Sequence, residues 1–169
     1  MRLRSDVRVT PTTNLCSKKL NAEDAEAPLF PARDRGDYLD TSNVDRITAA
    51  IIGSAMKVHS KLGPGLLESA YRACLAYELR KSGLSVECEV PLPIVYDAVE
   101  IDVGYRLDML VESIVVTELK TVRRVFQVHR AQLLSHLRLG GYPVGLLINF
   151  HVVRLKHGIT RVVNGFGPQ

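Results

Sequence analysis

The sequence predicts an α/β domain in which helices pack on a mixed β-sheet, and three observations carry this prediction. Helical and strand-like apolar patterns follow one another from residue 41 onwards in the order ααββββαββ. Residues 114–120 are β-branched and mostly apolar, as in a central strand. Hydrophobic residues make up 46% and charged residues 24% of the 169 residues, which excludes wholesale disorder and fits one domain.

The apolar spacing also places the individual elements. Gly63-Pro64-Gly65 ends the first helix, Gly83 the second, and Gly140-Gly141 the third. The expected helices span residues 41–62, 66–82 and 128–139. The expected strands span residues 84–90, 94–99, 103–111, 114–120 and 144–150, with a short edge strand at 152–156.

Residues 1–40 lack sustained periodicity, and we expect a disordered N-terminal extension there, with residues 41–169 as one domain. No run of about 18 apolar residues is present, and residues 1–40 contain no apolar signal-peptide core. Cys16, Cys74 and Cys88 are scattered and form no C-x-x-C pair. We therefore expect a protein of a reducing compartment, the cytoplasm, with no membrane partner.

The net charge of +4 is unevenly distributed along the chain. Residues 1–40 hold seven acidic and seven basic side chains, so the excess belongs to residues 41–169. No acidic residue follows Glu118, whereas eight basic residues do: Lys120, Arg123, Arg124, Arg130, Arg138, Arg154, Lys156 and Arg161. This basic segment is either a solvated face or a surface that contacts phosphates beside a carboxylate site.

Two carboxylates and a lysine are predicted to meet on one hairpin. A tight turn at residues 112–114 would place Asp108 directly opposite Glu118, with Lys120 on the same face of the sheet. Two carboxylates about 4 Å apart repel by roughly 4 kcal/mol at an effective dielectric constant of 20. Either Lys120 alone compensates this repulsion in an ordinary ion pair, or a divalent cation such as Mg²⁺ or Mn²⁺ supplies further positive charge.

Two helices offer further polar side chains. Glu68 begins the second helix with Tyr71 and Arg72 on the same face, and it either joins the acidic site or is a favourable acid at a helix N-terminus. Gln132 in the third helix is either a site residue or a solvated one, and His136 is expected on the surface of that helix. The chain contains neither G-x-x-x-x-G-K-[ST] nor G-x-S-x-G, so the sequence gives no support to a P-loop or a serine hydrolase.

Residues 65–71, GLLESAY, form a G-x-x-E-x-x-Y motif, which follows VHSKLGP at residues 58–64. Five further blocks come in order: Tyr96, Arg106-Leu107-Asp108, Glu118-Leu119-Lys120, HRAQLL at residues 129–134 and GLLINF at residues 145–150. With these blocks the chain resembles the bacterial family named GxxExxY over about residues 41–163. That family looks like a branch of the PD-(D/E)xK nuclease superfamily.

The resemblance implies a restriction-endonuclease-like core, a mixed sheet flanked by helices with an acidic metal site on a central hairpin. Asp108 would be the Asp of the superfamily signature, and Glu118 and Lys120 would be its E-x-K. Glu68 would be the helical Glu of the site, and Gln132 the Gln of its helical Q-x-x-x-Y motif. His136 stands where that motif usually has Tyr, which puts the aromatic role of the position in doubt.

The resemblance also implies a chemistry. The ligands of one or two Mg²⁺ or Mn²⁺ ions would be Glu68, Asp108, Glu118 and the Leu119 carbonyl. Lys120 and Gln132 would orient the attacking water. The nucleic-acid contacts would come from Tyr71, Arg123, Arg124, Arg130 and His136. The implied activity is hydrolysis of phosphodiester bonds in DNA or also RNA. The superfamily often dimerises, so the resemblance leaves a homodimer or a separate partner protein open.

Two other functions stay open on the sequence. The chain could be a non-cleaving accessory module that keeps the fold and binds nucleic acid through its basic C-terminal third. Such binding would survive loss of Glu118 and would need no metal. The chain could also be an interaction domain whose charged hairpin is only a cluster of ion pairs.

Overall fold

The apolar stripes of three helices meet the strands on the two faces of one sheet. The computed structural model describes residues 41–97, 99–101 and 105–165, and the predicted N-terminal extension lies outside these residues. The helices are α1 (Thr41–Leu62), α2 (Glu68–Lys81), α3 (Gln127–Gly140) and the 3-10 helix η2 (Leu155–His157). The strands are β1 (Val86–Pro91), β2 (Ile94–Tyr96), β3 (Val99–Ile101), β4 (Arg106–Val111), β5 (Val115–Lys120), β6 (Val144–Asn149) and β7 (Ile159–Val163).

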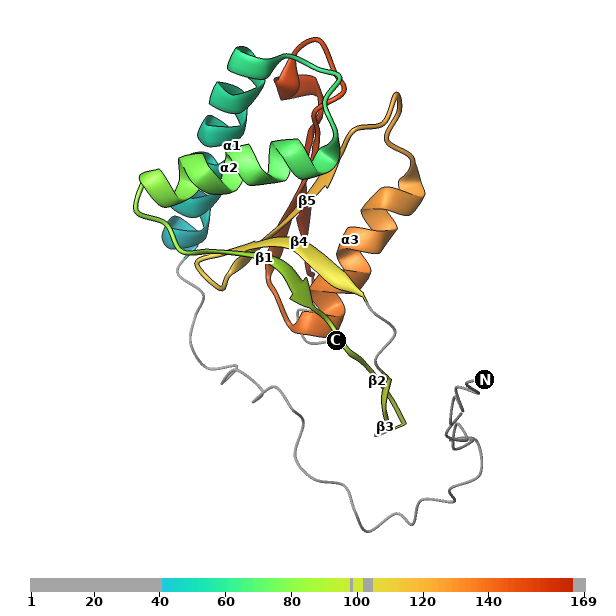
Figure 1. Ribbon diagram of the computed structural model, residues 1–169. Helices are drawn as coiled ribbons and strands as arrows, with labels where there is room; N and C mark the ends of the chain where they lie inside the picture. The colour runs from blue at the N-terminus through green and yellow to red at the C-terminus, as the bar shows by residue number, and fades with distance from the viewer. Residues whose placement is uncertain (1–40, 98, 102–104, 166–169) are drawn as a thin grey trace, which may run out of the picture. The chain divides into compact units, whose positions relative to one another are not determined.

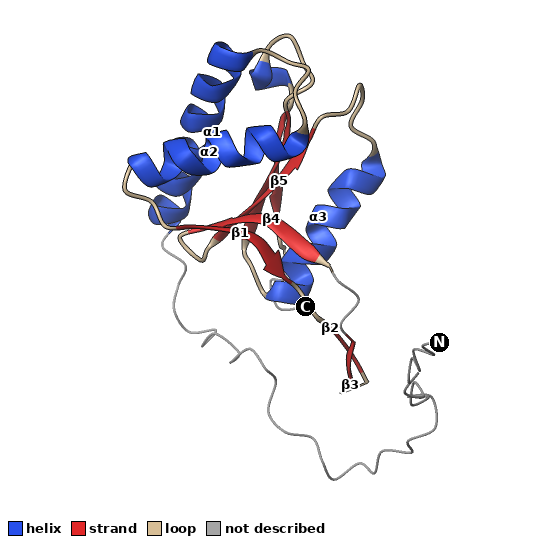
Figure 2. Cartoon of the chain, viewed as in Figure 1, coloured by secondary structure: helices blue, strands red, loops and turns tan. Residues whose placement is uncertain are grey.

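The main sheet has five strands in the order β1-β4-β5-β6-β7. Strands β1, β4 and β5 are antiparallel neighbours, β5 and β6 are parallel, and β7 runs antiparallel to β6. A parallel pair needs a crossover connection, and α3 provides it. Helices α1 and α2 cover one face of the sheet and α3 covers the other (Figures 1 and 2). The predicted α/β class, with a mixed sheet flanked by helices, is therefore confirmed.

Strand β5 is the centre of both apolar cores. On one face Leu119 packs with Ile47 of α1 and Leu75 of α2, none of which has exposed surface. On the other face Val116 packs with Leu133 of α3. A strand buried on both faces has no polar alternation, which explains the apolar run that predicted it. None of the helices in the described residues is long and apolar enough to span a membrane.

Two strand predictions are wrong. Residues 94–99 were expected as one strand, but β2 and β3 form a separate hairpin because the chain turns at Asp97, which has φ 49°. Residues 152–156 were expected as the edge strand, but they form a loop that leads into η2, and Val153 is 90% exposed there. The chain rejoins the sheet only as β7, after the Asn149 amide donates to the Gly158 carbonyl and closes the loop. Five strands, not four, therefore precede α3.

Tyr71 holds the turn between α1 and α2. Its ring has no exposed surface and stacks on Phe150, with ring centroids 4.3 Å apart. Its hydroxyl donates to the Gly63 carbonyl at 2.5 Å and accepts from the Leu66 amide at 3.2 Å. Gly65 in this turn has φ 111°, a conformation that favours glycine. The burial of Tyr71 contradicts the expectation that it contacts nucleic acid.

Removing this hydroxyl in Tyr71→Phe is expected to lower the free energy of unfolding by about 1–2 kcal/mol, because two backbone groups lose their partner. Urea unfolding followed by circular dichroism measures the change. Tyr77→Phe on the same helix is the control: its ring is 63% exposed, and a change below about 0.5 kcal/mol is expected. If Tyr71→Phe were as stable as wild type, the turn would not depend on the hydroxyl.

Candidate active site

Asp108 and Glu118 lie where the β4–β5 hairpin stops pairing. The hairpin turns at residues 112–114, and its last rung joins Met109 to Thr117, which is the register predicted from the sequence. The next rung would join Asp108 to Glu118, but β4 leaves β5 at that point. The two carboxylates therefore stand at a fork between the strands, which we call the β4–β5 fork.

Asp108 occupies an irregularity in β4. The β1–β4 ladder skips Asp108 and Glu89, and Glu89 has φ 54°. Asp108 Oδ2 accepts a hydrogen bond from the Leu119 N–H at 2.8 Å. This side chain thus bonds the backbone of β5 just beyond the point where β4 and β5 stop pairing. Asp108 Oδ1 lies 3.4 Å from Arg72 of α2, and Arg72 also contacts Glu89 at 3.0 Å. Burial, and then the charge of Glu118, raise the pKa of Asp108.

Glu118 and Lys120 form a buried ion pair. Lys120 Nζ donates to Glu118 Oε1 at 2.6 Å, and only 15% and 4% of the two side chains are exposed. Burial alone would raise the pKa of Glu118, but the neighbouring His136 and Lys120 hold it below its ordinary value. Burial alone would lower the pKa of Lys120, but Glu118 raises it above its ordinary value. Both groups are therefore charged at neutral pH.

His136 of α3 lies against this ion pair. Its Nδ1 is 3.7 Å from Glu118 Oε2, too far for a hydrogen bond, and neither atom has a hydrogen-bond partner among the described residues. Tyr105 lies edge-on to the imidazole ring. The expected position of His136 on the helix surface is wrong, because the residue is only 3% exposed and lies beside the buried Leu137. Its burial also contradicts the expected contact with nucleic acid.

The carboxylates approach the fork from different sides of the sheet. Glu118 lies next to His136 of α3, whereas Asp108 contacts Arg72 of α2. The prediction that both side chains share one face is therefore wrong. The irregularity of β4 explains this, since its neighbours Leu107 and Met109 also belong to different cores although a regular strand would put them on one face.

Glu68 begins α2 and completes the cluster. Burial, and then the charge of Asp108, raise the pKa of Glu68; Glu118 adds to this rise, while Lys120 and Arg72 oppose it. Four charged groups from three elements thus act on one another at the β4–β5 fork. We call Glu68, Asp108, Glu118 and Lys120 the fork cluster.

The other predicted site residues lie at the surface. Gln132 is exposed on α3, one helical turn before His136. Arg123 and Arg124 are exposed in the loop that follows β5, and Arg130 is exposed on α3. Their contacts with a substrate stay predictions.

Two residues near the site were not assigned to it from the sequence. Arg72 holds Asp108, and its position one turn after Glu68 was the available signal. Asn149 is 2% exposed at the end of β6, where its side chain donates to the Val122 carbonyl at 2.7 Å and accepts from the Val122 amide at 3.1 Å. A polar residue that ends an apolar strand was the signal for Asn149. Its bonds fix the chain just beyond Lys120.

The chemistry of the fork cluster fits a hard divalent cation. Among residues 41–97, 99–101 and 105–165, no three Asp, Glu, His or Cys side chains form a ready metal cage. However, Glu118 Oε2 is a buried oxygen that no described donor satisfies. The charge of Asp108 also raises the pKa of Glu68, and the charge of Glu118 raises the pKa of Asp108. Carboxylate oxygens are the ligands that Mg²⁺ and Mn²⁺ prefer. The donor set therefore fits such an ion, although the side chains do not enclose it as they stand.

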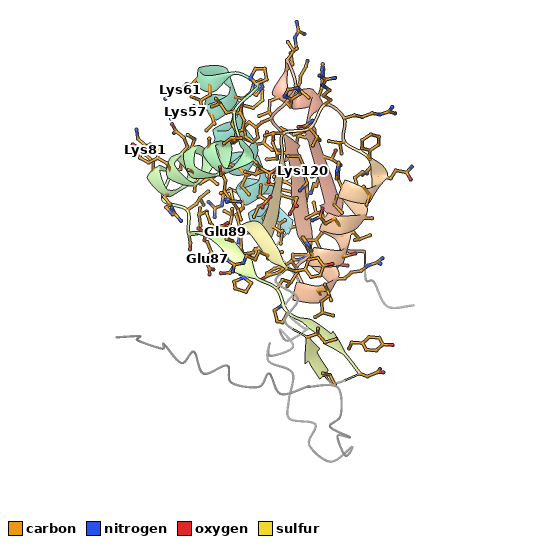
Figure 3. The ribbon with its side chains drawn as sticks, turned by 45° about the vertical axis from the view of Figure 1, so that its right-hand side comes forward. Lys57, Lys61, Lys81, Glu87, Glu89 and Lys120 are labelled. Carbon is orange, nitrogen blue, oxygen red and sulfur yellow. The ribbon has the colours of Figure 1, made fainter. Side chains whose placement is uncertain are left out.

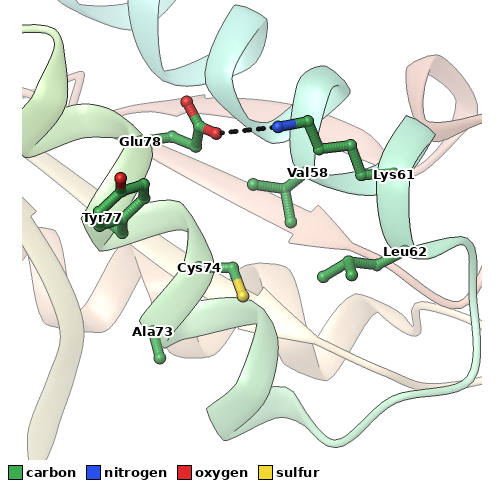
Figure 4. Close-up of a pocket in the computed structure, with 7 residues that line it drawn as sticks. All are labelled: Val58, Lys61, Leu62, Ala73, Cys74, Tyr77 and Glu78. Carbon is green, nitrogen blue, oxygen red and sulfur yellow. Dashed lines mark ion pairs between the residues drawn. The ribbon is translucent and has the colours of Figure 1, made fainter.

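A cavity of about 280 Å³ lies between α1 and α2 and is separate from the fork cluster (Figure 4). Its lining is mostly apolar and includes Val58, Cys74 and Tyr77. The residues of α2 that line it lie on the side of the helix opposite Glu68. Figure 3 likewise shows Lys120 in the interior of the domain, away from the lysines of α1 and α2.

A mixed sheet that carries an Asp and a Glu-x-Lys at the fork of its central hairpin is the arrangement of a nuclease-type domain. The family model of the PD-(D/E)XK nuclease superfamily matches residues 45–162 of this chain. The chain therefore belongs to this superfamily. A search of curated proteins and a search of solved structures each return no match.

Proposed function

We propose that this chain is a divalent-metal-dependent nuclease that hydrolyses phosphodiester bonds of DNA. The convergence of Glu68, Asp108, Glu118 and Lys120 at the β4–β5 fork of a PD-(D/E)XK domain carries this proposal. The excess of basic side chains after Glu118 supports a polyanionic substrate. The free thiols of Cys74 and Cys88 fit a reducing compartment such as the cytoplasm.

Glu68, Asp108 and Glu118 would hold Mg²⁺ or Mn²⁺, with the Leu119 carbonyl as a further ligand. A bound divalent cation supplies a water of lowered pKa and stabilises the charge that develops on the phosphate. Because the pKa of Lys120 is raised, this residue stays protonated and cannot serve as the base at neutral pH. Lys120 would instead orient the water and stabilise negative charge in the transition state.

The outer residues would position the substrate. Gln132, which is exposed on α3, would orient the same water or a phosphate oxygen. Arg123, Arg124 and Arg130 would bind the phosphate backbone, and such contacts carry no base information. We therefore expect little sequence specificity from this chain alone, whether it acts as a monomer, as a homodimer or with a partner protein.

Asp108→Asn is expected to reduce cleavage at least 100-fold, because a proposed metal ligand is lost. A 100-fold reduction corresponds to about 2.7 kcal/mol of transition-state stabilisation. The assay uses end-labelled single- and double-stranded DNA and RNA, with Mg²⁺ or Mn²⁺ and with EDTA. Asp97→Asn, which changes an exposed residue of the β2–β3 turn, is the matched control and should cleave like wild type. Equal cleavage by wild type and Asp108→Asn, or no cleavage of any substrate by wild type, would refute the proposal.

A non-cleaving nucleic-acid-binding module is the second candidate. The Lys120–Glu118 ion pair favours it, because Lys120 already neutralises one of the carboxylates. This function predicts that binding in EDTA persists in Glu118→Gln and that wild type cleaves nothing. Metal-dependent cleavage that Asp108→Asn removes would exclude it.

A further inference from the structure

Phe126 presents an aromatic ring to solvent at the start of α3. It is the N-cap residue of that helix, and its side chain is 57% exposed. The Arg124 guanidinium lies over the ring, 5.8 Å from its centroid. Large aromatic rings usually bury most of their surface, so an exposed one among polar neighbours needs an explanation.

The loop that carries this ring is held in place. The Phe126 amide donates to His129 Nδ1 at 3.1 Å, which closes the first turn of α3. At the other end of the loop, Asn149 bonds both backbone groups of Val122. The position of the ring is therefore defined before a ligand arrives, which reduces the entropic cost of binding.

The surroundings of Phe126 select a polyanion. Arg123, Arg124 and Arg130 are exposed within a few residues of the ring. No acidic residue occurs in the sequence after Glu118, so the local charge is not compensated from this segment. An exposed aromatic ring among arginines is the combination that binds single-stranded nucleic acid, because the bases stack and the cations hold the phosphates.

Phe126 is also within reach of the fork cluster. It starts the helix that carries His136, and ten residues of α-helix rise about 15 Å. His136 lies against Glu118. A nucleic-acid strand with one base stacked on Phe126 could therefore place a phosphate at the β4–β5 fork, a few nucleotides along the strand from that base.

We propose that Phe126, with Arg124 beside it, is a stacking platform for an unpaired base of the substrate strand. This inference rests on the proposed function and narrows its substrate to nucleic acid with unpaired nucleotides within a few nucleotides of the cleaved bond. A continuous duplex keeps its bases stacked inside and offers only phosphates to this loop.

The test measures binding in EDTA, so that its result does not depend on cleavage. Fluorescence anisotropy compares a single-stranded DNA with a blunt duplex of the same length. Phe126→Ala is expected to weaken single-strand binding about tenfold and to change duplex binding less than twofold. Phe126→Trp should keep the affinity, and Phe126→Leu should behave like alanine, because it is apolar but has no aromatic face.

Further measurements separate this role from a structural one. Val128→Ala, which removes another exposed side chain (67%) from the same end of α3, should bind like wild type. Arg124→Gln should weaken both ligands. With a single 2-aminopurine moved along the strand, fluorescence should be quenched at one position by wild type and recover in Phe126→Ala. The melting temperature of each Phe126 variant should match wild type, because the ring is exposed.

Unchanged single-strand binding by Phe126→Ala, or an equal loss for single strand and duplex, would overturn the stacking platform and leave the nuclease proposal intact. Failure of wild type to bind any nucleic acid at low salt would overturn both. If Phe126 instead contacted a protein partner, Phe126→Ala would leave single-strand binding unchanged.

Discussion

Replacing Lys120 by methionine is expected to lower the free energy of unfolding by about 3–5 kcal/mol, because it leaves the Glu118 carboxylate buried without its partner. Methionine keeps the apolar stem, so the change reports on the charge. Phosphodiester cleavage should fall roughly 100- to 1000-fold, the usual loss when one donor to a developing charge is removed. Urea unfolding and single-turnover cleavage measure the two effects.

The pH dependence of the stability difference between wild type and Lys120→Met tests whether the ion pair causes it. The pKa of Glu118 is lowered in the folded chain, so its pairing stabilises the fold above the ordinary pKa of about 4.5 and is lost as the pH falls through the lowered value. The stability gap between wild type and Lys120→Met should therefore close in acid. Lys156→Met, at an exposed position in η2, is the control and should match wild type throughout. A gap that did not change with pH would mean that packing, not charge, is responsible.

Replacing Glu68 by glutamine is expected to act in the opposite direction and to stabilise the metal-free protein by about 1 kcal/mol. Glu68 is half-buried beside Asp108 and Glu118, and its raised pKa indicates that the charged form is disfavoured in the folded chain. The same substitution should weaken Mn²⁺ binding at least about tenfold, since even the outer partners of metal ligands contribute that much. Thermal unfolding without metal and calorimetric titration with Mn²⁺ measure the two changes.

The size of the Glu68 effect also depends on pH. Below about 4.5 Glu68 is protonated in both the folded and the unfolded chain, so the penalty is absent. The penalty grows as the pH rises through the raised pKa and is complete above it. Stabilisation by Glu68→Gln should therefore be largest at neutral pH and vanish in acid, while Glu87→Gln at an exposed position on β1 should have little effect. Destabilisation by Glu68→Gln at neutral pH would contradict the clustering of carboxylates at the fork.

The parts of the fold that were predictable from the sequence are those fixed by local geometry. The tight turn between β4 and β5 was enough to predict their register up to Met109 and Thr117, which brings Asp108 and Glu118 to the same end of the hairpin. The period of two in β5 was enough to place Lys120 beside Glu118. The apolar stripe of α1 likewise predicted its bounds, because a period of 3.6 persisted over six turns and glycine followed it.

The parts that were missed depend on contacts between distant segments. The burial of Tyr71 and His136 is set by which side of each helix meets Phe150 or Glu118, and helical spacing alone does not specify this. The irregularity of β4 at Asp108 left no signal, because the residue with positive φ opposite it is Glu89 and not glycine. The role of Asn149 is likewise not specified locally, because its side chain forms two hydrogen bonds with the backbone of Val122, 27 residues earlier in the chain.

The hydroxyl of Tyr71 changes how the G-x-x-E-x-x-Y motif is to be interpreted. Gly65 permits the turn, Tyr71 fastens it, and of the three only Glu68 belongs to the fork cluster. Two of the three lettered positions therefore serve the architecture of the turn, and the third is the proposed metal ligand. A descendant of this chain that lost only the glutamate would still match most of the motif and is expected to fold around the same turn without the proposed metal ligand. In this chain the motif thus marks the turn first, and the glutamate has to be considered separately before an activity is assigned by analogy.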